Sequence, residues 1–146
     1  MIEALQFAAI CGSGLFAGAA LYINLVEHPA RMECGTELAA TVFGPSYKRA
    51  AVMQVALAAV ATISAIISAW HQNSALWAAG AALIFAVIPF TLIVILPTNK
   101  QLLDPLLDRS SAHTHTLLRR WARLHAGRTV MSLAAEFIFI AEVLGQ

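Results

Sequence analysis

Residues 75–96 read ALWAAGAALIFAVIPFTLIVIL, an unbroken stretch without a charged side chain. As a helix it would span about 33 Å, slightly more than the ~30 Å hydrocarbon core of a bilayer. Three more apolar stretches occupy 4–26, 50–70 and 129–144, and apolar residues at helical spacing extend the last one back to Leu117. We therefore expect one all-α domain, residues 1–146, an integral membrane four-helix bundle whose membrane helices lie at about 4–27, 50–70, 75–96 and 117–144.

The overall composition agrees with insertion into lipid. Hydrophobic residues make up 60% of the 146 residues and charged residues only 12%. A soluble domain is nearer 45–50% apolar and 25% charged. A soluble core of this size cannot hide so much apolar surface, so the lipid bilayer is the expected surrounding.

The nine Lys and Arg residues all fall in two of the five polar segments, between the first and second and between the third and fourth apolar stretches. By the positive-inside rule these segments face the cytoplasm, and both termini lie on the non-cytoplasmic side of a plasma membrane or bacterial inner membrane. We expect a short interfacial helix there at 36–42 followed by a turn at 43–46, and a short helix followed by a loop at 101–111. No basic patch is left over for nucleic acid.

Prolines and small residues predict how the helices end and pack. Pro29 and Pro97 are expected to end the first and third helices, and Pro89 to kink the third or leave one carbonyl free for a polar partner. Gly14 and Gly18 form a small-xxx-small pair, typical of a close helix contact within the bundle or of a homo-oligomer interface.

One cluster of polar side chains follows the first apolar stretch. Asn24, Glu27, His28 and Arg31 occur at i, i+3, i+4 and i+7, so they share one face of a regular helix. Tyr22 lies nearby, turned away by part of a turn. The cluster offers a base, a carboxylate and a cation at one helix end.

A second cluster lies on the fourth helix. Trp121, His125, Arg128, Ser132 and Glu136 also share one face. Glu136 would lie near the middle of the membrane, where an ionisable side chain must face protein or a cavity. It is either a clamp between helices or part of a site.

A third polar group, Asn99 with its neighbours, follows Pro97, and the predicted topology brings all three groups to the cytoplasmic end. This convergence predicts a site for a hydrophobic small molecule. We predict catalytic roles for His28, His125, Arg128 and Glu27, and substrate contacts for Tyr22, Asn24, Asn99, Trp121 and Glu136. The competing interpretation is that these side chains are ordinary interface anchors among the lipid headgroups.

The residues do not favour a metal centre. No HxxxH or ExxH pair occurs on one helix, and the two cysteines, Cys11 and Cys34, do not form a paired metal motif. We therefore predict no cofactor and no metal ligands. A haem or metal held by His28 and His125 is the alternative.

These motifs, in this order, resemble the anthrone-oxygenase-like family of small four-helix membrane proteins. The resemblance rests on Gly18–Tyr22, Val26–Arg31, Phe43–Ala50, Leu96–Asn99, Trp121, Leu124–His125 and Arg128. It implies the same fold and an oxidoreductase, because a few fungal members are associated with oxidising anthrones to anthraquinones without an added cofactor. It also implies a base at His28 or His125 and anion binding by Arg128 and Asn99. A non-enzymatic binding or accessory protein is the main rival hypothesis.

Overall fold

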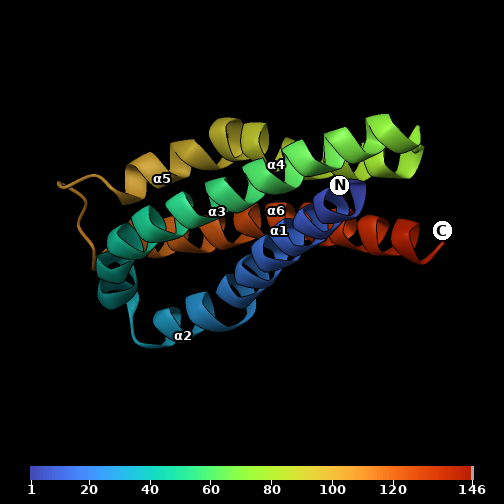
Figure 1. Ribbon diagram of the computed structural model, residues 1–146. Helices are drawn as coiled ribbons and strands as arrows, with labels where there is room; N and C mark the ends of the chain where they lie inside the picture. The colour runs from blue at the N-terminus through green and yellow to red at the C-terminus, as the bar shows by residue number, and fades with distance from the viewer. Residues whose placement is uncertain (146) are drawn as a thin grey trace.

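Four long helical segments make up the computed structural model, which describes residues 1–145 (Figure 1). No strand occurs in this part of the chain, so the prediction of an all-α four-helix bundle is confirmed. The elements are α1 (Ile2–Tyr22), η1 (Ile23–Glu27), α2 (His28–Glu33), α3 (Thr36–Gln72), α4 (Ala75–Phe90), η2 (Thr91–Ile95), α5 (Leu96–Leu102) and α6 (Ala112–Leu144). The first segment is α1–η1–α2 and the third is α4–η2–α5, where η1 and η2 are π-helical.

Three of the four segments are long and apolar enough to cross a bilayer, namely Ile2–Glu33, Thr36–Gln72 and Ala75–Leu102. The protein is therefore a membrane protein. The fourth segment, α6, is of similar length but carries more charge. Both termini and the α3–α4 turn lie at one end of the bundle, and the α2–α3 and α5–α6 connections lie at the other (Figure 1).

Two prolines behave differently from the sequence prediction. Pro29 and Pro97 were expected to end helices, but each lies in the first turn of a continuing helix, and the segments run on to Glu33 and Leu102. A π-helical stretch of five residues precedes each of them. The wider turn makes room for a proline ring that would clash with a carbonyl in a regular helix. Pro89 stays inside α4.

The second segment also corrects a prediction. The turn expected at 43–46, and a separate interfacial helix before it, are wrong, because α3 is continuous and contains Pro45. Phe43 is 2% exposed and packs edge-on against Trp121, with ring centroids 5.3 Å apart. Such packing offsets the roughly 3 kcal/mol that an interior proline costs a helix.

The connection before α6 is mostly loop. Only the first two residues of 101–111 are helical, as the end of α5, and the rest is turns and irregular backbone. The carboxylate of Asp108 accepts hydrogen bonds from the amide and hydroxyl of Ser110, which lower its pKa. Ser111 caps α6 by accepting from the Thr114 amide at 3.2 Å. This cap places the start of α6 at Ala112, five residues before the predicted start.

The two predicted interface glycines have different surroundings. A Cβ atom added to Gly14 would lie 2.9 Å from Oε1 of Glu136, so Gly14 packs against α6 inside the bundle. Gly18 is exposed and has nothing within 4 Å of that position. The close approach of α1 to α3 occurs instead at Gly12, where an added Cβ would lie 3.2 Å from that of Ala61.

Replacement of Gly80 by leucine is expected to lower stability by about 1–3 kcal/mol, the usual cost of overpacking. An added Cβ would lie 2.3 Å from a ring carbon of Phe139, which is fully buried and stacks on Trp77. Gly18→Leu is the matched control on an open surface. Thermal unfolding in detergent should show a lower Tm for Gly80→Leu alone, and equal Tm values for the two variants would contradict this packing.

Candidate functional site

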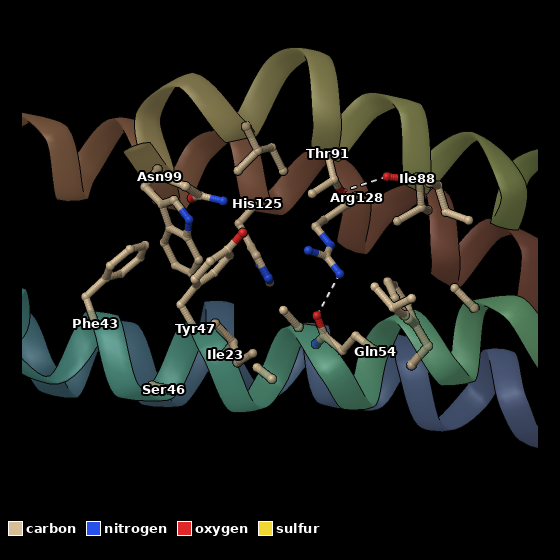
Figure 2. A pocket seen from close by; sticks show the side chains of 18 of the residues that line it. Ile23, Phe43, Ser46, Tyr47, Gln54, Ile88, Thr91, Asn99, His125 and Arg128 are labelled. Carbon is tan, nitrogen blue, oxygen red and sulfur yellow. Dashed lines mark hydrogen bonds between the residues drawn. The ribbon is translucent and has the colours of Figure 1, made fainter. Parts of the chain in front are cut away.

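A cavity of about 160 Å³ lies in the bundle and is lined by all four helical segments (Figure 2). It borders both hydrophobic clusters of the core, one containing Phe16 and Val87 and the other Phe43 and Ile95. Polar and charged side chains interrupt its apolar wall. They are Glu27, Arg31, Ser46, Tyr47, Gln54, Thr91, Asn99, Trp121, His125 and Arg128.

Arg128 brings a positive charge into this cavity. Its Nη2 donates a hydrogen bond to Oε1 of Gln54 at 2.6 Å, and its guanidinium lies 5.0 Å from the ring centroid of Phe16. In residues 1–145, no carboxylate lies within ion-pairing distance of Arg128, and its Nε has no hydrogen-bond partner. Arg128 is partly buried, and a cation withdrawn from water is normally paired, so this guanidinium favours an anionic ligand.

Several other buried polar atoms around the cavity also have no partner within the described chain. They are Nδ2 and Oδ1 of Asn99, Nε1 of Trp121 and Nε2 of Gln54. Asn99 is only 1% exposed, so water outside the bundle does not satisfy it. Buried polar groups are nearly always hydrogen-bonded in folded proteins. A group of unpaired atoms around one cavity therefore indicates a ligand with oxygen substituents.

Aromatic rings form one wall of the cavity. Phe43 stacks on Tyr47 with centroids 5.8 Å apart, and Trp121 stacks on His125 with centroids 4.7 Å apart. Figure 2 shows His125 and Arg128 pointing from α6 into the space between α3 and the α4–α5 segment. A flat aromatic ligand fits such a wall, since offset stacking needs planar partners.

Asn24 lies behind His125 and does not line the cavity. Its Oδ1 is 2.6 Å from Nδ1 of His125 and accepts a hydrogen bond from Thr129 Oγ1 at 2.7 Å. Its Nδ2 donates to the carbonyl oxygen of Ala122 at 3.1 Å. Asn24, which was predicted to contact the substrate, therefore contacts His125 instead.

Glu27 and Arg31 form an ion pair at the border of the cavity. Arg31 also donates to the hydroxyl of Ser46 at 2.7 Å, and that hydroxyl donates to Glu27 at 3.4 Å. Both charges therefore have partners, unlike that of Arg128. The pair links the end of the first segment to α3.

Three predicted site residues lie away from the cavity. His28 contacts Trp121, with ring centroids 5.3 Å apart, but it lines a separate cleft with Arg119 and Arg123. Tyr22 is 56% exposed on the outside of the bundle. Glu136 accepts a hydrogen bond from Ser13 and faces Gly14. These positions do not support a direct role in binding at this cavity.

The placement of the two histidines bears on the haem alternative. Trp121 contacts both imidazole rings, and of the two histidines only His125 lines the cavity. Within residues 1–145, no three His, Cys, Asp or Glu side chains come together as a metal site would need.

Comparison with known proteins identifies the family. A family model described as anthrone oxygenase matches residues 43–138. The chain belongs to the anthrone oxygenase family. This confirms the resemblance seen in the sequence. No curated protein and no solved structure gives a significant match.

The part matched by the anthrone oxygenase model includes cavity residues that sequence reasoning missed, above all Gln54 and Tyr47. Gln54 is 3% exposed and is the one amide side chain in the apolar stretch 50–70. A buried amide among membrane-spanning residues needs a partner, and that signal could have identified it. Tyr47 gave no such signal, because it precedes the predicted start of the second membrane helix at residue 50, an interface position where tyrosine is common.

Proposed function

We propose that the protein is a membrane oxygenase that converts a flat, hydrophobic aromatic ketone of the anthrone type to the corresponding quinone in this cavity. One observation carries the proposal. His125 and the guanidinium of Arg128, which has no carboxylate partner in the described chain, line the same mainly apolar, aromatic-walled cavity. Membership of the anthrone oxygenase family supports the choice of reaction.

In this proposal His125 removes a proton from the activated CH₂ group of the substrate. Histidine suits the task because a neutral imidazole has one ring nitrogen free to accept a proton. Glu27 is already engaged in an ion pair with Arg31. The resulting enolate oxygen is stabilised by the guanidinium of Arg128, where charge develops in a site shielded from water.

Dioxygen then takes one electron from the enolate, and the two radicals combine to form a C–O bond. The peroxide anion takes back the proton held by His125, and the resulting hydroperoxide loses water and leaves a new carbonyl group. One oxygen atom enters the product and the other leaves as water, together with the two hydrogens of the CH₂ group. The substrate supplies all the electrons, so the proposed reaction needs no added cofactor.

The substrate is proposed to enter from the bilayer. Val55 of α3 and Leu92 of η2 both line the cavity, and both are more than half exposed on the outer surface. Elements α3 and η2 do not pack closely on each other. The proposed orientation has the polar, basic end in the cytoplasm and both termini outside, in a plasma or inner membrane.

Narrowing this opening is expected to slow turnover of membrane-dissolved substrate. A Val55→Trp/Leu92→Trp double variant places two large side chains at the opening and should raise KM several-fold. Val52→Trp/Ile93→Trp is the matched control, because these side chains are also exposed on the same two elements but do not line the cavity. Kinetics in lipid vesicles that give the same KM for both double variants would exclude this route.

Oxygen uptake with an anthrone tests the proposed reaction itself. Purified protein in nanodiscs should consume one O₂ for each anthraquinone formed, above the autoxidation seen in protein-free nanodiscs. A rate equal to that background would reject the proposed function and favour a binding or accessory role.

A further inference from the structure

We propose that Asn24 is a positioning residue that holds His125 in one tautomer, with the proton on Nδ1 and the lone pair of Nε2 free to act as the base. The assignment of a tautomer rests on hydrogen bonds alone, whereas its use in catalysis rests on the proposed function. Asn24 comes from the first helical segment and His125 from the last.

The orientation of the Asn24 amide is fixed by its own hydrogen bonds. Nδ2 donates to the carbonyl oxygen of Ala122 at 3.1 Å, and a carbonyl can only accept. Oδ1 therefore faces the other side, where the hydroxyl of Thr129 donates to it at 2.7 Å. An amide flipped by 180° would place two acceptors together at Ala122 and two donors together at His125 and Thr129 unless both rearranged.

The orientation of Asn24 decides the tautomer of His125. Nδ1 of His125 lies 2.6 Å from Oδ1 of Asn24, and an amide oxygen carries no proton. Nδ1 must therefore be the donor. In a neutral imidazole the other nitrogen, Nε2, is then an acceptor. The described chain offers Nε2 no hydrogen-bond partner, and the ring lines the cavity.

The ring is also held in its plane by packing. Trp121 stacks on His125 with centroids 4.7 Å apart and planes 30° apart. One hydrogen bond along the edge and one stacked face leave the imidazole little freedom to turn. A fixed ring with a free nitrogen matches what a general base needs.

The π-helical stretch η1 provides this contact. Asn24 is its second residue, and η1 packs against α6 at the level of His125. Insertions of this kind are rare in helices and occur frequently at functional sites. A histidine positioned by a second residue through its other nitrogen is also the arrangement found in hydrolase triads.

Nuclear magnetic resonance of the imidazole nitrogens tests the tautomer directly. Protein labelled with ¹⁵N in histidine is placed in nanodiscs at a pH where His125 is neutral, as shown by titration in the same sample. The His125 signals are assigned by their loss in His125→Phe. We expect the proton on Nδ1 in the wild type, and a proton on Nε2 there would overturn the proposal without any Asn24 variant.

Three variants separate positioning from mere packing. Asn24→Leu removes the acceptor with little change in size, and we expect a large part of His125 to move its proton to Nε2. Thr129→Val is the matched control, since it removes the other partner of the same oxygen and should leave the tautomer unchanged. Asn24→Asp keeps an acceptor at this position and should also preserve the wild-type tautomer. This variant is measured in place of Asn24→Leu if the latter does not fold.

Turnover connects the tautomer to the reaction. Asn24→Leu should lower kcat roughly 100-fold with little change in KM, because substrate binding is left intact while the base is in the wrong form. An unchanged tautomer in Asn24→Leu would overturn the proposal. A tautomer that follows Asn24 in a protein without oxygenase activity would support the positioning of His125 and reject the proposed function instead.

Discussion

Replacement of His125 by phenylalanine is expected to lower kcat by about 10²–10⁴-fold, the range that a positioned general base contributes. Phenylalanine keeps a flat ring against Trp121 but has no nitrogen to take the proton of the substrate. Turnover is measured as oxygen uptake and quinone absorbance. Substrate binding should change little, because the aromatic wall of the cavity is kept.

His28→Phe is the matched control for this prediction. His28 is buried and also contacts Trp121, but it does not line the cavity. Its replacement is expected to leave kcat within a few-fold of wild type. Equal losses in the two variants would show that the effect comes from packing around Trp121, and full activity in both would remove histidine from the mechanism.

Replacement of Arg128 by leucine is expected to lower kcat about 10²–10³-fold, similar to the loss of one oxyanion donor elsewhere. The enolate would form without a cation beside its oxygen, so the barrier to proton removal rises. Arg128→Lys should recover only part of the rate, because an ammonium lacks the planar fork of donors that a guanidinium presents. Steady-state oxygen uptake on both variants measures the loss.

Arg123→Leu controls for the loss of a positive charge on α6, because Arg123 is exposed and does not line the cavity. Thermal unfolding provides a second control. Arg128 is a cation without a carboxylate partner, so its replacement by leucine is expected to cost little stability apart from the freed amide of Gln54. Wild-type kcat in Arg128→Leu would contradict the anion-binding role.

The four-helix membrane architecture could be predicted from the sequence because it depends on long-range composition. Apolar stretches long enough to cross a bilayer mark the segments, and the spacing of polar links places both termini at one end. The helix ends were less predictable. Proline disrupts a regular helix, but π-helical turns accommodate Pro29 and Pro97 here. Nothing in the local sequence predicts those turns.

The site residues on α6 could be predicted from helical spacing, whereas those around the π-helical stretch η1 could not. On α6 a regular 3.6-residue period brings Trp121, His125 and Arg128 to the cavity as expected. Glu136 lies about 22 Å further along α6 than Trp121, too far along the helix to line the same cavity. In the π-helical stretch η1 there are more residues per turn, so His28 does not share a helix face with Asn24. A pattern based on 3.6 residues per turn fails there.

The sequence could not show which side chains of different helices contact each other, even for residues that it marked as candidates. Asn24 and His125 lie far apart in the chain and meet only because the first and last segments pack side by side. Gln54 of α3 lines the cavity and accepts a hydrogen bond from Arg128 of α6. Spacing along one helix shows which side chains share a face, but not which face of another helix they meet.

Oxygen consumption by the purified protein in lipid nanodiscs, with an anthrone as substrate and with wild type, His125→Phe and His28→Phe run in parallel, is the most direct measurement. We predict one O₂ consumed per quinone formed by wild type and His28→Phe, and a rate near the protein-free background for His125→Phe. Background rates for all three proteins, or an undiminished rate in His125→Phe, would contradict oxygenation in this cavity.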